Sequence, residues 1–435
     1  MKIFDCFTFY NELEMLDIRL HVLDSVVDYF VLAEIPKTHL GLDKEKIFDL
    51  NRERFSKFSH KIIYISSDKV PEAKGYGDWT IENFQRNLIF HGLNGKCDYD
   101  DVIMISDLDE IPNPYILKNL KKVELHLHLD GSVELNTISK ITNENIDTLK
   151  EKMIAKDKCE NLSEYLTKFD TPIECMQTKE NLTLIAKDLV NYLERENVIY
   201  AEIRFAPMFH TKEGLSYEDV IESVLEGVNS NKNVKTNLIL CMMRGFSKEA
   251  NLKTIEVAEK YLNKGVCALD LAGAEDKYPL IDYIDLFDII KEKNIPFTIH
   301  AGENGSHKEI DLAIKLGTKR IGHGIHAYES ENTINLLKEK NILLEICPTS
   351  NVQTNSINEY KNHPIYNFYE LGINVCINTD NKTVSNISIN DEYIKLYNTF
   401  NFNTHDFKIM NVNAIKSSFL SDEEKEKLID EIIHK

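Results

Sequence analysis

The sequence predicts an α/β protein whose larger part, residues 122–435, is a (β/α)8 barrel, also called a TIM barrel. Two observations carry this prediction. Eight short apolar, β-rich runs alternate with amphipathic stretches, a pattern typical of parallel strands joined by helices, and eight such repeats can close a barrel. Polar signatures follow these runs, and barrel enzymes place their sites at that end of the strands. The expected strands are Val123–Leu129, Val198–Phe205, Asn237–Met243, Val266–Leu271, Pro296–His300, Arg320–Gly322, Ile342–Cys347 and Asn374–Thr379.

The segments between these strands favour helices. Leu182–Arg195 and Asp219–Val228 are examples, because their apolar residues recur at helical spacing. Near the end of the chain, Ser421 and Glu424 form a capping-box pattern ahead of an apolar series that continues to Ile433. The chain is therefore expected to end on a helix.

Residues 1–121 follow a different pattern and predict a second α/β domain, incomplete for its type. The expected helices are Asn11–Val27 and Trp79–Leu93. The expected strands are Ile3–Phe9, Tyr29–Ala33, Lys61–Ile65 and Val102–Ile105.

Composition excludes several classes of partner. The chain carries 51 basic and 71 acidic residues, a formal charge of −20, which disfavours nonspecific binding to nucleic acid or to an anionic membrane. It has no apolar run long enough to span a membrane, and its N-terminus does not resemble a signal peptide. Its eight cysteines are scattered, which is typical of free thiols in a reducing compartment, so a cytoplasmic location is expected. Oligomeric state does not follow from the sequence.

The most informative motif is His-x-His, formed by His126 and His128 in the first barrel strand. Side chains two residues apart on a strand point to the same face, so the two imidazoles make half of a metal site. Two histidines in an apolar strand are more often packed or surface residues, and the metal interpretation depends on the other signatures. These are Asp270–Glu275, His300–Glu303, Gly322–Gly324, Cys347–Asn351 and Asn378–Asn381.

In this order, the motifs resemble the adenosine deaminase family of zinc hydrolases, from about Lys122 to the C-terminus. The resemblance implies one zinc ion per barrel, bound by His126, His128, His300 and Asp380. A zinc ion with an open position lowers the pKa of a bound water to about 7 and so provides a nucleophile. The implied reaction converts adenosine, and also 2′-deoxyadenosine, to inosine and ammonia in purine salvage.

The same resemblance implies two catalytic side chains. Glu303 is expected to deliver a proton to N1 of the purine, for which it must stay protonated near neutral pH, and desolvation favours that state. His323 is expected to orient the metal-bound water, to take its proton or to stabilise the oxygen as it gains negative charge. Without the surrounding motifs, Glu303 would be interpreted as half of a loop salt bridge and His323 as a packed residue.

Substrate contacts follow from further matching positions. By resemblance, Asp130 accepts a hydrogen bond from the ribose 5′-hydroxyl, Gly273 donates its backbone N–H to purine N3, and His128 also lies against the substrate. Asn381 stands where many members have an aspartate facing N7, and an amide can donate to N7 without being protonated. Asp130 favours a purine nucleoside over a free base. Adenine or another adenine-type nucleotide remains the alternative substrate.

The N-terminal part has its own candidate site. Asp107 and Asp109 form an Asp-x-Asp motif after the strand Val102–Ile105, and such a pair can hold a divalent ion, Mn²⁺ or Mg²⁺, that bridges a nucleotide diphosphate. The commoner interpretation of a lone Asp-x-Asp is an acidic turn that caps a helix.

With Phe4–Phe7 and Gln85–Asn87, this motif resembles a glycosyltransferase family that includes the β-1,4-mannosyl-glycoprotein N-acetylglucosaminyltransferases. The resemblance ends near Leu117, about half-way through such a domain, and only residues 118–122 separate it from the barrel pattern. Residual transfer of N-acetylglucosamine and a non-catalytic appendage are both open for this part.

Overall fold

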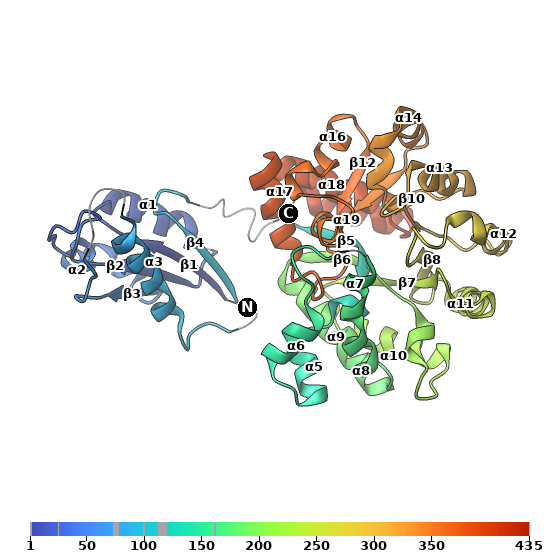
Figure 1. Ribbon diagram of the computed structural model, residues 1–435, viewed down its shortest axis with the longest axis horizontal. Coiled ribbons are helices and arrows are strands. Elements are labelled where there is room, and N and C mark those ends of the chain that lie inside the picture. The colour runs from blue at the N-terminus through green and yellow to red at the C-terminus, as the bar shows by residue number, and fades with distance from the viewer. Residues whose placement is uncertain are drawn as a thin grey trace. The chain divides into compact units, whose positions relative to one another are not determined.

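The structure is a computed structural model, and it describes residues 2–24, 26–72, 78–98, 101–111, 120–160 and 162–434. The chain divides into two compact units, Met1–Asn119 and Leu120–Lys435 (Figure 1). Residues 118 and 119 of the expected joint lie outside the described residues, as does Leu117, near which the transferase resemblance ends.

The N-terminal unit is built on a parallel four-stranded sheet with the order β3-β2-β1-β4. All four expected strands and both expected helices are present, although the first helix is shorter than the predicted Asn11–Val27. The elements are β1 (Ile3–Thr8), α1 (Leu13–Leu23), β2 (Tyr29–Glu34), α2 (Ile47–Leu50), β3 (Ile62–Ser66), α3 (Thr80–Leu93) and β4 (Val102–Ser106).

Helices cover the two faces of this sheet unequally. Alternate side chains of β1 point to opposite faces, so Phe7 packs in a cluster with Leu20 of α1, whereas Phe4 packs in a second cluster with Leu88 of α3. On the edge strand β4, Ile103 and Ile105 are 41% and 54% exposed. No described residue covers that part of the sheet, as expected of an incomplete domain.

The larger unit contains eight parallel strands in two four-stranded sheets, with the orders β5-β6-β7-β8 and β12-β11-β10-β9. Isolated parallel bridges join the sheets at both ends, between Leu269 and Phe297 and between Leu127 and Asp380. The strands therefore follow one another around a ring, as a (β/α)8 barrel requires (Figure 1). They are β5 (Lys122–His128), β6 (Val198–Phe205), β7 (Lys235–Met243), β8 (Val266–Ala272), β9 (Ile299–Ala301), β10 (Arg320–His323), β11 (Leu343–Ile346) and β12 (Asn374–Ile377).

Each predicted barrel strand coincides with an observed one, and the helices lie between and after them. The C-terminal capping interaction also forms, because Ser421 and Glu424 exchange hydrogen bonds ahead of the last helix. The helices of this unit are α5 (Leu135–Thr142), α6 (Ile146–Met153), α7 (Leu162–Leu166), α8 (Asp170–Cys175), α9 (Lys179–Arg195), α10 (Tyr217–Val228), α11 (Lys248–Tyr261), α12 (Ile284–Glu292), α13 (His307–Leu316), α14 (Glu331–Glu339), α15 (Pro348–Gln353), α16 (Ile365–Glu370), α17 (Ile389–Phe400), α18 (Thr404–Ser417) and α19 (Asp422–His434).

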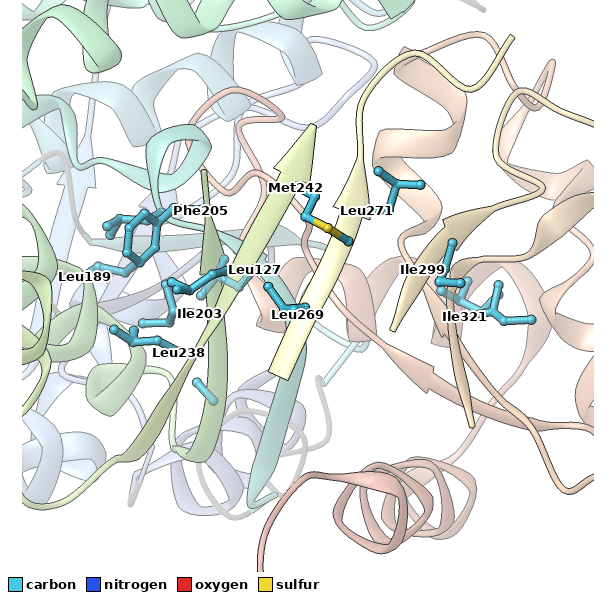
Figure 2. Packing of buried hydrophobic residues seen from close by; sticks show 14 of the residues in the cluster. Leu127, Leu189, Ile203, Phe205, Leu238, Met242, Leu269, Leu271, Ile299 and Ile321 are labelled. Atoms are coloured by element: carbon cyan, nitrogen blue, oxygen red, sulfur yellow. The ribbon is translucent and has the colours of Figure 1, made fainter. Parts of the chain in front are cut away.

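The two faces of the barrel strands differ sharply in polarity. On β6, Ile203 and Phe205 join a large apolar cluster that includes Leu189 of α9, and Figure 2 shows part of this cluster. The alternating residues Glu202 and Arg204 belong to the opposite face, where they are fully buried and form ion pairs. Apolar burial thus holds the helices to the strands, while the ring encloses charged groups. Within the described part of the chain, no helix is both long and apolar enough to cross a membrane.

Candidate metal centre and active site

Four side chains converge at the carboxyl ends of the barrel strands. His126 and His128 come from β5, His300 from β9, and Asp380 follows β12. His128 Nε2 lies 3.3 Å from His300 Nε2 and 3.3 Å from Asp380 Oδ1, and His126 Nε2 lies 3.5 Å from the same Asp380 oxygen. These are the four predicted metal ligands, and the structure brings them together.

The outer nitrogens of two of these histidines face carboxylates. His126 Nδ1 lies 2.8 Å from Glu345 Oε2, and His300 Nδ1 lies 2.9 Å from Asp270 Oδ2. A proton held on Nδ1 by a carboxylate leaves the Nε2 lone pair free for a metal. His126 Nε2 is buried and has no hydrogen-bond partner among the described residues, a costly state unless a ligand occupies the point that it faces. The four side chains therefore fit one small divalent metal ion.

A buried arginine stabilises the two carboxylates. Arg204 Nη1 lies 2.8 Å from Asp270 Oδ2, and its Nη2 lies 2.7 Å from Glu345 Oε2. Arg320 Nε also contacts Glu345, at 2.7 Å. Burial alone would raise the pKa of Glu345, but the two guanidinium groups hold it well below its usual range. Both acids therefore stay ionised inside the barrel and can accept hydrogen bonds from the N–H groups of the ligand imidazoles.

A second group of possible ligands consists of His126, His323 and Cys347 and shares His126 with the first. Thiolate, rather than thiol, binds metals. Burial raises the pKa of Cys347 well above its usual range, which disfavours its thiolate, and the first group, with the Asp380 carboxylate beside it, is the better metal site.

Asp380 is held in place by its backbone as well as by its side chain. Its N–H donates to the His126 carbonyl at 3.0 Å, and its carbonyl accepts from the His128 N–H at 2.7 Å. Its φ of 62° lies in the left-handed region, which is unusual for aspartate and is typically retained where function requires the conformation. Ser350 Oγ donates to Asp380 Oδ2 at 2.6 Å, which leaves Oδ1 facing the histidines.

A cavity of about 550 Å³ opens onto this centre. Glu303, in the loop after β9, lines it, and burial raises the pKa of this carboxyl well above its usual range, with further contributions from Asp380 and Glu275. Glu303 Oε2 lies 3.7 Å from Nε2 of His323, another lining residue. Burial thus favours the neutral form of this carboxyl, as expected of a proton donor.

The carboxylate of Glu275 organises the loop that carries Glu303. It accepts hydrogen bonds from four backbone N–H groups, those of Gly302, Glu303, Asn304 and Gly305, at 2.6 to 3.1 Å. Glu275 ends the motif Asp270–Glu275, and the sequence alone indicates no role for it. A carboxylate that binds four successive amides fixes the loop in one conformation.

The four residues predicted to contact substrate all line the cavity: His128, Asp130, Gly273 and Asn381. Burial raises the pKa of Asp130 to about 6. Gly131 makes room for Asn381, since a Cβ at Gly131 would lie 2.0 Å from Asn381 Oδ1. Gly273 has a φ of +105°, a conformation that glycine adopts readily. The structure thus groups all the predicted barrel site residues around one centre.

The sequence alone did not identify Asp270 and Glu345 as the carboxylates that face the ligand histidines, although Glu345 leaves a signal in the sequence. Glu345 is a lone acid within the apolar run Ile342–Cys347, and a buried acid in a strand requires a partner. The sequence alone assigns no catalytic or binding role to Arg204, and its contacts with Asp270 and Glu345 show how it supports the metal site.

The candidate site of the N-terminal unit is more open. Asp107 and Asp109 are both exposed, and Asp107 Oδ1 lies 2.8 Å from Arg86 Nη2 beside a cavity of about 220 Å³. The buried Arg19 pairs with Asp5 and donates to the carbonyls of Asp107, Leu108 and Glu110, so it shapes the turn that carries the two acids.

Comparison with known proteins agrees with this geometry. Residues 121–435 match the family model for adenosine deaminase. An adenosine deaminase from Clostridium perfringens (strain 13 / Type A) is 40% identical over 324 residues, which span 72% of this chain and 98% of that protein. The chain belongs to the adenosine deaminase family. Its membership confirms the predicted resemblance and the prediction of a hydrolytic deaminase.

Solved structures of deaminases share the fold of this family member. An adenine deaminase from Arthrobacter aurescens is 26% identical with a TM-score of 0.66, covering 72% of this chain and 98% of the other. An Arabidopsis N6-mAMP deaminase is 25% identical with a TM-score of 0.64, covering 72% and 97%. The likeness confirms the predicted fold class.

The N-terminal part has its own match. Residues 1–133 match glycosyltransferase family 17, which confirms the second resemblance.

Proposed function

We propose that this chain is a zinc-dependent adenosine aminohydrolase, which converts adenosine and 2′-deoxyadenosine to inosine or deoxyinosine and ammonia. One observation carries the proposal: three imidazoles and one carboxylate surround a single point at the base of a cavity that Glu303, a buried carboxyl with a raised pKa, also lines. Family membership supports the reaction class.

The donor set supports zinc as the metal. Zinc binds imidazole nitrogen and carboxylate oxygen at about 2.0–2.2 Å, so neighbouring ligands around one ion lie roughly 3 to 3.5 Å apart. The separations of 3.3 to 3.5 Å among His126, His128, His300 and Asp380 agree with that value. When bound, zinc would supply a water activated for attack at neutral pH.

The chain's own residues then account for the other requirements of deamination. Attack on the amino-bearing carbon disrupts the purine ring unless N1 is protonated, and the neutral Glu303 carboxyl is placed by Glu275 to donate that proton. We propose that His323 contacts the reacting oxygen, that the Gly273 N–H donates to purine N3, and that the Asn381 amide donates to purine N7. His128 lines the cavity beside the bound purine in addition to binding the metal.

Charge in the cavity favours a nucleoside over a nucleotide. Asp130 is expected to accept from the ribose 5′-hydroxyl, and a 5′-phosphate at that position would face its carboxylate. The cations Arg244 and Lys277 line the cavity, and Arg244 donates to the carbonyls of Tyr278 and His300. Adenine and adenine nucleotides are the alternative substrates. Adenine lacks the sugar that Asp130 would bind, and the phosphate of a nucleotide carries the same charge as the Asp130 carboxylate.

A deamination assay on a substrate panel tests the proposal. Purified full-length protein is expected to contain about one zinc per chain, to deaminate adenosine faster than adenine or AMP, and to lose activity in chelator until zinc is restored. Faster turnover of AMP or adenine would replace the proposed substrate. Full activity in metal-free protein would remove zinc from the mechanism.

We further propose that residues 1–121 and 122–435 are separate domains, and that the enzyme acts in cytoplasmic purine salvage. For the N-terminal domain, transfer of N-acetylglucosamine is a second candidate activity. The match to glycosyltransferase family 17 and the Asp-x-Asp turn held by Arg19 favour it, and the transfer would need Mn²⁺ or Mg²⁺ at Asp107 and Asp109. The pairing of Asp107 with Arg86 weighs against it.

A further inference from the structure

A line of buried polar groups runs from the start of α16 to His323. The backbone N–H of Ile365 lies 3.1 Å from His363 Nδ1, and His363 Nε2 lies 3.2 Å from Asn351 Oδ1. Asn351 Nδ2 then lies 3.0 Å from His323 Nδ1. The three side chains are 0 to 3% exposed, so water has little access to them.

The backbone group at one end fixes the direction of every hydrogen bond in this line. A backbone N–H can only donate, so His363 Nδ1 must accept, and a neutral imidazole that accepts at Nδ1 carries its proton on Nε2. That proton is donated to Asn351 Oδ1. The amide then presents its N–H group to His323 Nδ1, which must also accept.

Neither reversal of the Asn351 amide nor a charged His363 ring satisfies the same contacts. A reversed amide would turn its NH₂ group toward the Nε2–H of His363, so that two donors would face each other. A charged His363 would turn its Nδ1–H toward the Ile365 N–H. Burial also lowers the pKa of His363 to about 3, which agrees with a neutral ring.

We infer that His363 and Asn351 are positioning residues that hold His323 as the neutral tautomer with its proton on Nε2, the nitrogen on the Glu303 side of the ring. His323 is then a hydrogen-bond donor to the reacting oxygen. The tautomer follows from these contacts, whereas the identity of the oxygen rests on the proposed function.

This tautomer selects among the roles that family resemblance left open for His323. A ring with Nε2–H can orient the attacking oxygen and stabilise negative charge on it, as donors in oxyanion holes do. It has no lone pair at Nε2 and cannot take a proton there. The structure thus favours orientation and charge stabilisation over proton removal.

Nitrogen-15 NMR of histidine-labelled, zinc-loaded full-length protein tests the inference independently of turnover. Two-bond proton–nitrogen correlations identify which ring nitrogen is protonated, and the His323 signals are assigned by their loss in His323→Asn. We expect a protonated Nε2 and a bare Nδ1 at His323, and the same at His363. A proton on His323 Nδ1 would overturn the inference, even if the protein deaminates adenosine, whereas failure of the proposed function would appear only in the deamination assay.

Two sets of variants make the test causal. Asn351→Asp keeps the shape but offers an acceptor to both histidines, so the His323 proton is expected to move to Nδ1 and kcat to fall about 10²-fold, a typical effect of losing one such donor. Zinc content should remain unchanged. An Nε2–H signal that persists with full activity would contradict the inference.

Should Asn351→Asp fail to fold, His363 provides the matched pair. His363→Gln can still donate to Asn351 Oδ1 and is expected to retain most of the activity and the Nε2–H signal. His363→Leu cannot donate, so the amide is free to turn and His323 should become a mixture of tautomers, with kcat about tenfold lower. Equal activities and spectra for the two variants would contradict the inference.

Discussion

Both units place acids at the carboxyl end of a parallel strand, and each contains a fully buried arginine that contacts the segment carrying them. In the barrel, Arg204 contacts the carboxylates of Asp270 and Glu345, which in turn face the imidazoles of two metal-ligand candidates. In the N-terminal unit, Arg19 contacts Asp5 and the backbone carbonyls of the acidic turn, and the Asp107 side chain remains 53% exposed.

The difference follows from how the sheets end. A ring of strands brings the residues at its carboxyl ends toward one centre, where they exclude water and fix one another's ionisation. In the open sheet, β4 is an edge strand, so the side chains of the acids that follow it are exposed to solvent. The Asp107 side chain pairs with Arg86. Asp270 and Glu345 of the barrel are thus buried and ion-paired, whereas Asp107 and Asp109 of the N-terminal unit are exposed.

The largest expected effect separates the two sites by activity. Glu303→Gln removes the proposed proton donor and keeps its shape, so kcat for adenosine should fall by about 10² to 10⁴, the usual contribution of a general acid. Asp109→Asn, at the other site, should leave the same rate unchanged. A Glu303→Gln rate within a few-fold of wild type would remove Glu303 from the mechanism, and a large effect of Asp109→Asn would couple the two units.

The two buried arginines give the next comparison. Arg204→Met leaves Asp270 and Glu345 without a major partner, and Arg19→Met does the same to Asp5, so each should destabilise its own unit by about 3–5 kcal/mol. Arg204→Met, unlike Arg19→Met, should also lower zinc affinity, because Arg204 contacts the carboxylates behind the ligands and Arg19 does not. Denaturant unfolding and zinc titration of both variants measure this. Equal zinc affinities would show that the inner carboxylates do not depend on Arg204.

The sequence predicts most of this architecture, because strands and motif residues leave local signals. The His-x-His spacing on one strand and the polar signatures after the others locate the barrel site residues without any knowledge of contacts. Which distant residues become partners cannot be predicted in this way, even where a lone acid in an apolar run, such as Glu345, indicates that a partner exists. Glu345 meets His126 across 219 residues, and Asn351 becomes meaningful only when His323 and His363 lie on either side of it.

The role of Glu275 also becomes visible only from its contacts in the structure. Its replacement is expected to have a smaller effect on kcat/KM, and that effect depends on pH. Glu303 must be protonated to act, and the negative charge of Glu275 contributes to its raised pKa. In Glu275→Gln the pKa of Glu303 should therefore fall, so kcat/KM should decline at a lower pH than in wild type. We also expect about a tenfold loss at neutral pH, since the amide cannot accept all four backbone hydrogen bonds.

The matched control for this prediction is Glu275→Asp, which keeps the charge but shortens its reach. Its rate should fall without a shift of the alkaline limb of the pH profile. If the alkaline limb of the kcat/KM profile stayed in place in Glu275→Gln, or moved to higher pH, the charge of Glu275 would not raise the pKa of Glu303.

The smallest effect is expected at the N-terminal acids. Asp107 is already paired with Arg86, and a cation must displace that guanidinium or bind through the exposed Asp109 alone. Exposed acids without a converging third ligand hold Mn²⁺ weakly. Titration of Mn²⁺ into the zinc-loaded full-length protein should therefore show no stoichiometric site, and Asp109→Ala should change nothing. Tight binding of one Mn²⁺ that Asp109→Ala abolishes would contradict this expectation. The open sheet would then bind a cation as the closed barrel does, and sugar transfer from a nucleotide diphosphate donor would be the activity to assay next.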